Sequence, residues 1–254
     1  MKLRILGSGT SSGVPRIGND WGSVDPLEPK NRRLRASALA TIGDTRLLID
    51  AGPDLREQLN TAGVGEVDHV LVTHDHADHI HGLDDVRQLA HNLGRQVPLR
   101  GRADMLDRLV PRFRYLFEGN ALYPAVVRSE PIDGEWVIGP ARLRFVDQPH
   151  GRITSLGIRF DEGQRSLVYA TDFAEVNDAM ASLYAGADTW IADCLRRRPH
   201  PTHAHLDAVL GWARELRVGQ LLLTHLDNSM DHAQLIAELP DWAAPAFDGL
   251  EVEI

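Results

Sequence analysis

The sequence comprises 254 residues, of which 43% are apolar and 25% are charged, and its formal net charge is −9. This composition supports a substantial core, excludes disordered and collagen-like chains, and argues against a broad nucleic-acid-binding surface. No stretch approaches the ~18 apolar residues of a membrane helix, and no signal-peptide core is present, so we expect a cytoplasmic protein.

Short apolar runs bounded by turn residues predict strands along the chain, at residues 3–6, 38–42, 47–49, 69–72, 143–146, 156–160, 167–170, 190–192 and 221–223. Helical periodicity predicts helices at residues 54–61, 84–92, 105–115, 176–184, 207–216 and 232–238. Residues 141–170 resemble antiparallel strands, which does not fit a doubly wound parallel sheet. The pattern favours an α/β (α+β) fold, with two packed sheets and helices outside, in a single domain over residues 1–254.

The Gly-rich segment 7–15 near the start of the chain is the first motif. It lacks the Lys of a phosphate-binding P-loop, and it has Ser12 where a dinucleotide-binding fingerprint needs a third glycine. We interpret it as a tight turn that either borders a site or is purely structural. Arg32, Arg33 and Arg35 follow, and whether they bind a substrate phosphate stays open.

The strongest signal is the motif H-x-H-x-D-H, which consists of His74, His76, Asp78 and His79 and follows the apolar run 69–72. In an extended segment alternate side chains point the same way, so the first two histidines can converge on one ion. The aspartate and the last histidine can reach a neighbouring ion. Because Cys194 is the one cysteine, metal must be held by imidazoles and carboxylates.

Two ions require further ligands from distant loops, and three candidates follow apolar runs. His150 comes after residues 143–146, Asp172 after residues 167–170 and His225 after residues 221–223. Ligands placed just beyond rigid strands are typical of a site assembled at one edge of packed sheets.

This motif order resembles that of the metallo-β-lactamase superfamily. The resemblance implies a four-layer αβ/βα sandwich and two divalent ions, Zn²⁺ or Mn²⁺. One ion would be held by His74, His76 and His150, the other by Asp78, His79 and His225, with Asp172 as the bridge.

Within the superfamily the sequence is similar to the cyclic phosphodiesterases of the PhnP type in four stretches, residues 7–15, 79–85, 201–203 and 247–250. This similarity implies that His203 donates a proton to the leaving oxygen and that Asp78 fixes the ions and the attacking hydroxide. Relatives often carry cysteines for a structural zinc early in the chain. Residues 18–29 contain none, so we expect no structural zinc.

Several other polar residues are candidates for a role at the site, and most of them have two interpretations. Asp50 either orients a ligand imidazole or caps a helix. The run Arg196, Arg197 and Arg198 either binds a terminal phosphate or forms a solvated face. His200 and His205 are as readily solvent-exposed as functional, no base partner is evident for Cys194, and Asp248 is interpreted as part of a turn.

The sequence thus predicts a binuclear metal-dependent phosphodiesterase for small, cyclic ribose phosphodiesters, in which two ions supply hydroxide at neutral pH. The alternatives are a tRNase Z-like nuclease and a lactone, thioester or β-lactam hydrolase. A non-enzymatic metal-binding protein is the remaining class. We expect no membrane or stable nucleic-acid partner, and the resemblance suggests a homodimer.

Overall fold

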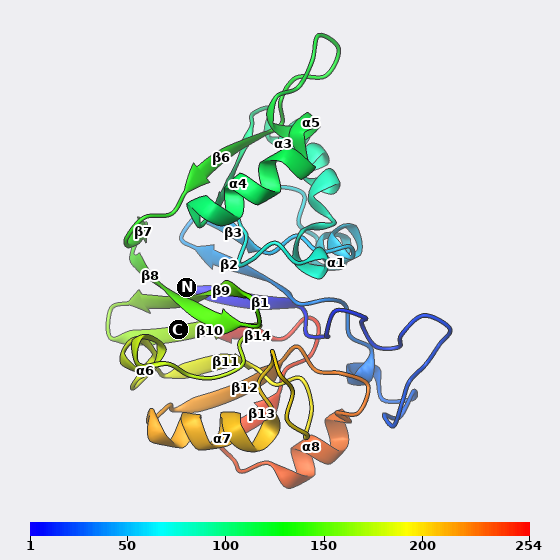
Figure 1. Cartoon of the computed structure of the whole chain (residues 1–254), viewed down its shortest axis with the longest axis vertical. Helices are drawn as coiled ribbons and strands as arrows, with labels where there is room; N and C mark the ends of the chain where they lie inside the picture. Colours follow the sequence, from blue (N-terminus) through cyan, green and yellow to red (C-terminus); the bar gives the residue numbers. More distant parts are fainter.

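Two seven-stranded sheets pack face to face in the computed structural model, which describes all 254 residues (Figure 1). The first sheet has the order β14 (Glu251–Glu253), β1 (Lys2–Gly7), β2 (Ser37–Ile42), β3 (Thr45–Ile49), β4 (His69–Leu71), β5 (Val97–Gly101) and β6 (Val127–Pro131). The second has the order β13 (Ala243–Pro245), β12 (Gln220–Thr224), β11 (Thr189–Asp193), β10 (Arg165–Ala170), β9 (Ile153–Glu162), β8 (Ala141–His150) and β7 (Trp136–Ile138).

Both sheets combine an antiparallel half with a parallel half. Strands β3 to β6 run parallel in the first sheet, and β10 to β13 run parallel in the second. Strand β8 is antiparallel to β9, which is antiparallel to β10, so β8 and β10 run in the same direction. The carboxyl ends of β8, β10, β11 and β12 therefore meet at one edge, which is where open sheets of this kind bind ligands.

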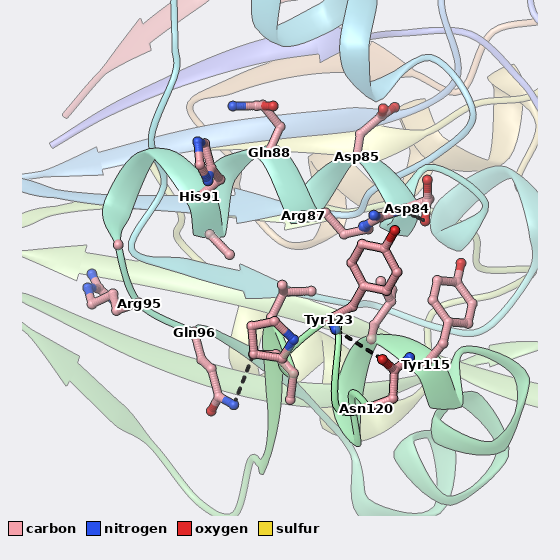
Figure 2. A pocket seen from close by; sticks show the side chains of 16 residues that line it. Asp84, Asp85, Arg87, Gln88, His91, Arg95, Gln96, Tyr115, Asn120 and Tyr123 are labelled. Atoms are coloured by element: carbon pink, nitrogen blue, oxygen red, sulfur yellow. Dashed lines mark hydrogen bonds and ion pairs between the residues drawn. The ribbon is translucent and has the colours of Figure 1, made fainter.

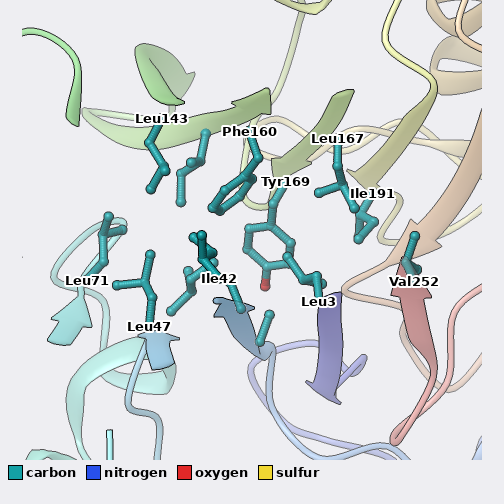
Figure 3. Close-up of a cluster of buried hydrophobic side chains, with 14 of the residues drawn as sticks. Leu3, Ile42, Leu47, Leu71, Leu143, Phe160, Leu167, Tyr169, Ile191 and Val252 are labelled. Atoms are coloured by element: carbon teal, nitrogen blue, oxygen red, sulfur yellow. The ribbon is translucent and has the colours of Figure 1, made fainter. Parts of the chain in front are cut away.

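The interior between the sheets is apolar. Alternate residues of the strands point inward, among them Leu3, Leu47, Leu143, Phe160 and Leu167, which are completely buried (Figure 3). Figure 3 also shows the Tyr169 ring among them. Burial of such side chains contributes about 1.5–3 kcal/mol each.

Helices cover both outer faces (Figure 1). Apolar side chains connect the first sheet to α1 (Leu55–Ala62), α2 (Ala77–Ile80), α3 (Val86–Leu93), α4 (Ala103–Arg112) and α5 (Arg114–Phe117). A second outer cluster connects the other sheet to α6 (Asp178–Tyr184), α7 (Leu206–Glu215) and α8 (His232–Glu238). Two short 3₁₀ helices, η1 (Pro29–Asn31) and η2 (Leu83–Asp85), complete the elements. The predicted four-layer αβ/βα sandwich is thereby confirmed, and no helix combines the length and apolarity needed to cross a bilayer.

Residues 8–35 leave the first sheet and lie against the loop that follows β12. Arg33, which is 1% exposed, donates hydrogen bonds to the carbonyl oxygens of Asp227 and Met230 at 3.1 and 2.6 Å. Thr10 donates its backbone N–H to Leu226 at 3.2 Å. The Gly-rich turn is thus held beside the carboxyl end of β12 in the second sheet.

The sequence analysis missed five strands, β5, β6, β7, β13 and β14, and predicted one continuous helix over residues 105–115. The helix ends at Arg112, and α5 begins at Arg114. Pro111 has no backbone N–H to continue the helical hydrogen bonds, and Phe113 leaves helical geometry with φ −119°.

Candidate active site

The H-x-H-x-D-H motif begins three residues beyond β4. His76 has extended backbone and is the N-cap of the short helix α2, which carries Asp78 and His79. His74 and His79 are buried, whereas His76 is exposed. The first sheet therefore presents two of its four motif ligands from extended chain and two from a helical turn.

The second sheet supplies three further side chains at its strand ends. His150 is the last residue of β8, Asp172 lies two residues beyond β10, and His225 directly follows β12. Asp172 and His225 have left-handed backbone, with φ of 57° and 59°. Few non-glycine residues adopt this conformation, although Asp and His do so more readily than most.

These seven side chains form two groups. Within each group the potential ligand atoms all lie within 4.8 Å of one another. The first group consists of His74, His76 and His150, and the second consists of Asp78, His79, Asp172 and His225. The structure therefore brings all seven candidate ligands together, with Asp172, which was predicted as the bridge, in the second group.

Asp172 stands between the two groups. Its Oδ2 lies 3.2 Å from Nε2 of His79, and its Oδ1 lies 3.5 Å from Nε2 of His225. The same Oδ1 lies 3.7 Å from Nε2 of His150 and 3.9 Å from Nε2 of His74. A carboxylate with this reach can contact an ion in either group.

Hydrogen bonds to the outer ring nitrogens orient three of the imidazoles. Nδ1 of His79 lies 2.7 Å from Oδ2 of Asp50, and Nδ1 of His150 donates to the carbonyl oxygen of Thr202 at 2.8 Å. Nδ1 of His74 lies 3.0 Å from the hydroxyl of Thr73. With Nδ1 engaged, Nε2 is left for an ion, which is the usual arrangement of metal-binding histidines.

The buried charges in the second group strongly perturb one another. Burial alone would lower the pKa of His225, but Asp172 and Asp78 raise it to about 9. Burial alone would raise the pKa of Asp172, but His225 and His79 hold it well below its usual value. The carboxylates thus stabilise positive charge at this position, whether it is carried by protons or by metal ions.

Unpaired nitrogen atoms are a second indication that these residues fit divalent metal ions. The Nε2 atoms of His74, His79 and His225 are buried without a hydrogen-bond partner. Buried polar atoms are usually paired, and those that are not call for an explanation such as an ion. Imidazole and carboxylate ligands suit Zn²⁺ and Mn²⁺.

A further imidazole, His203, lies over the two groups. Its ring stacks on His225 at a centroid distance of 4.8 Å and lies 4.9 Å from the His150 ring. Its side chain is 14% exposed, and its Nδ1 lies 3.0 Å from Oδ2 of Asp193. Oδ1 of Asp193 lies 3.6 Å from Nδ1 of His225.

Sequence reasoning missed Asp193. Its only signal was its place at the carboxyl end of β11, between the strands that lead to Asp172 and His225. This buried carboxylate orients the His203 ring through its contact with Nδ1, and it faces Nδ1 of His225 at 3.6 Å.

The structure supports the interpretation of Asp50 as a residue that orients a candidate ligand imidazole, and not as a helix cap. It accepts hydrogen bonds from the backbone N–H and hydroxyl of Thr73 at 2.7 and 2.8 Å and contacts His79. The N-cap of α1 is Asp54 instead. The reading of Asp248 as part of a turn was incomplete, because its buried carboxyl accepts hydrogen bonds from Ser8 and Leu34.

Neither run of arginines forms an open phosphate site, because several of the arginines in each run are buried or engaged in other contacts. Arg33 is buried, and Arg32 lies over the Trp21 ring. Arg196 donates to two carbonyl oxygens of its own loop, and Arg197 pairs with Glu238 at 2.7 Å. Of the remaining candidates, Arg198 is exposed, His200 lies beside His203, His205 caps α7 and Cys194 is buried.

A groove of about 1090 Å³ lies elsewhere, between α3 and the segment that follows α5 (Figure 2). Tyr115, Tyr123, Arg87 and Arg95 line it, and none of the seven candidate ligands does. The chemistry is therefore not located in this groove.

The sandwich fold, the candidate metal ligands at its edge and the similarities described next define a metal-dependent hydrolase. The profile of the beta-lactamase superfamily domain matches residues 45–226, which include all seven candidate ligands. A solved structure described as a new diphosphatase from the PhnP family is 35% identical, with a TM-score of 0.90 over 99% of this chain and 96% of that one. The chain therefore belongs to the metallo-β-lactamase superfamily and is similar to the PhnP family within it.

Two curated relatives differ in their names. The octanoyltransferase of Porphyromonas gingivalis is 29% identical over the whole of this chain, which spans only about half (52%) of that protein's length. Ribonuclease Z of Mycolicibacterium gilvum is 26% identical over 89% of both chains. These names describe different activities, so they do not point to a common substrate.

Proposed function

We propose that this protein is a binuclear metal-dependent phosphodiesterase that hydrolyses small phosphodiesters, cyclic ribose phosphates among them. The observation that carries the proposal is the arrangement of two ligand groups around Asp172, with His203 held above them by Asp193. Divalent ions in the two groups would supply hydroxide at neutral pH and hold the phosphoryl oxygens.

The protein's own residues account for the remaining requirements. Asp78 and Asp172 supply negative charge for the ions, and Asp50 and Thr202 orient the ligand rings. An alkoxide leaving group needs a proton, which contributes about 10²- to 10⁴-fold to the rate. Because Asp193 engages Nδ1 of His203, Nε2 is the atom that can deliver this proton.

The similarity to a PhnP-family diphosphatase supports phosphoryl chemistry over carbonyl chemistry. The similarity to ribonuclease Z keeps a nuclease as the second candidate. The net charge of −9 favours the small substrate, since nucleic-acid binding depends on clustered positive charge. The same proposal includes Zn²⁺ or Mn²⁺ as the two ions and a homodimer as the assembly.

The test compares His203→Ala with the unaltered protein on two substrates after loading with each metal. A 2′,3′-cyclic nucleotide has an alkoxide leaving group, whereas bis-p-nitrophenyl phosphate releases a phenolate that needs no proton. We expect kcat to fall about 10²- to 10⁴-fold on the first substrate and much less on the second.

His205→Ala is the matched control, because this histidine lies two residues away and caps α7. It should leave both activities nearly unchanged. Equal losses on the two substrates would remove the proton-donor role of His203. Turnover of lactones or thioesters without phosphodiester turnover would replace the proposed function with carbonyl hydrolysis.

A further inference from the structure

A cluster of charged side chains outside the proposed chemistry surrounds Asp75, the residue between His74 and His76. Its carboxylate accepts hydrogen bonds from Nη2 and Nε of Arg108 at 3.0 and 3.3 Å. Nη1 of Arg112 lies 3.5 Å from Oδ2 of Asp75. The Asp75 side chain is only 12% exposed, so two guanidinium groups cover it.

Arg112 also bridges both ends of the segment that follows. Its Nη1 donates to the carbonyl oxygen of Asp75 at 3.0 Å, and its Nη2 donates to Nε2 of His81 at 3.2 Å. His81 is the C-cap of α2. One side chain therefore spans the segment from the residue before His76 to the end of the helix that bears Asp78.

Both arginines come from α4, which is fixed to the first sheet. Met105, Leu106 and Leu109 are its buried residues and belong to the apolar cluster that covers this sheet. Arg108 and Arg112 are four residues apart and so lie on one face of the helix. Nη1 of Arg108 also donates to the backbone and side-chain oxygens of Asp104, both at 3.0 Å.

We propose that Arg108 and Arg112 form a clamp that positions residues 74–79 for metal binding by holding Asp75 and His81. The inference rests on the proposed function, because it assigns these ligands to metal ions. Half-exposed ion pairs contribute little to global stability. Groups that orient metal ligands, in contrast, change metal affinity about 10- to 100-fold. Loss of the clamp should therefore affect metal binding far more than folding.

The test titrates metal-free protein with Co²⁺ and follows visible absorption, which reports both affinity and ligand geometry. In the variant R108A/R112A we expect the dissociation constant of at least one Co²⁺ equivalent to rise about tenfold or more, with altered absorption bands. The melting temperature of the metal-free variant should stay within a few degrees of that of the unaltered protein.

Arg114→Ala is the matched control, since Arg114 lies on the neighbouring helix and pairs with Glu118 at 2.6 Å, away from the ligands. Its Co²⁺ affinity should be unchanged. A double-mutant cycle supplies the second measurement. If the clamp acts through Asp75, Arg108→Ala should cost less affinity in an Asp75→Ala background than in the unaltered protein.

Unchanged Co²⁺ affinity and spectra in R108A/R112A, or additive effects of Arg108→Ala and Asp75→Ala, would overturn the clamp. Failure of the unaltered protein to bind two Co²⁺ ions would overturn the proposed function instead. The two failures are thus distinguished by the protein in which each appears.

Discussion

Asp248 joins the C-terminal end of the chain to the Gly-rich turn through a buried carboxyl group. Its Oδ1 accepts hydrogen bonds from the backbone N–H and hydroxyl of Ser8 at 2.8 Å, and its Oδ2 accepts one from Leu34 at 2.7 Å. Burial raises its pKa from 3.8 to about 6, since these bonds and the Arg33 charge offset desolvation only in part.

This carboxyl group predicts a distinct pH dependence of stability. Between about pH 4 and pH 6 the folded chain binds more protons at Asp248 than the unfolded chain. The contribution of Asp248 to the free energy of unfolding is therefore greatest below pH 4 and falls by about 3 kcal/mol as the pH rises through 6. Urea unfolding of metal-free protein and Asp248→Asn across this range should show their difference shrinking accordingly. A constant difference would contradict it.

At the level of single residues, the sequence identified those candidate ligands that lie in one short motif or directly follow an apolar strand. The motif holds His74 and Asp78 within a few residues, and His225 directly follows a recognisable apolar strand. Asp193 was missed because its role depends on the lateral order of β10, β11 and β12. Parallel pairing brings residues together that are far apart in sequence, and no local pattern records it.

Two helix caps that look equivalent in sequence should differ in their effect on stability. Asn177 caps α6 by accepting a bond from Met180 at 2.9 Å and makes no other side-chain hydrogen bond. Asp231 caps α8 by accepting a bond from Gln234 at 3.0 Å, and its Oδ2 also accepts bonds from Asn31 at 2.7 Å and from the backbone N–H of Asp25 at 3.0 Å.

We expect Asn177→Ala to lower the free energy of unfolding by about 1 kcal/mol. Asp231→Ala should lower it by about 2–3 kcal/mol, because it also removes a partner of a buried amide and loosens residues 23–31. Urea denaturation of the two variants measures the difference, and equal losses would show that the contacts with Asn31 and Asp25 contribute nothing.

At the level of elements, the short apolar runs correctly predicted nine of the ten strands that do not lie at a sheet edge, all but β5. The missed strands include the four sheet edges, β6, β7, β13 and β14. Three of these have only three residues, and β6 reads Val-Arg-Ser-Glu-Pro. Edge strands are commonly short, charged or proline-containing, since such features discourage unwanted pairing. The same features erase the hydrophobic pattern from which strands are predicted.

Across the whole molecule, the candidate ligands connect the two halves of the sandwich. Four come from the segment after β4, which includes α2, in the first sheet, and three come from the ends of β8, β10 and β12 in the second. Each group of ligands contains members from both sheets. Metal ions bound in these groups would cross-link the sheets at their shared edge.

Removal of metal should consequently lower the melting temperature. A ligand present at a thousand times its dissociation constant stabilises the folded state by about 4 kcal/mol, which corresponds to roughly 10 °C for a chain of this size. Thermal unfolding with Zn²⁺ and with EDTA measures this shift. Asp172→Ala should lose most of the shift, whereas His205→Ala should retain it. An equal shift in both variants would place the stabilising ion elsewhere.

The left-handed backbone of Asp50, Asp172 and His225 also bears on how the chain can diverge. Glycine adopts this conformation without the steric cost that other residues incur, so the backbone conformation alone would favour glycine at all three positions. An exchange of Asp50 for glycine would, however, remove its buried hydrogen bonds with Thr73 and its contact with His79. The three side chains therefore limit how the sequence can change, because the residue that relieves the backbone cost also removes the contacts that the side chain makes.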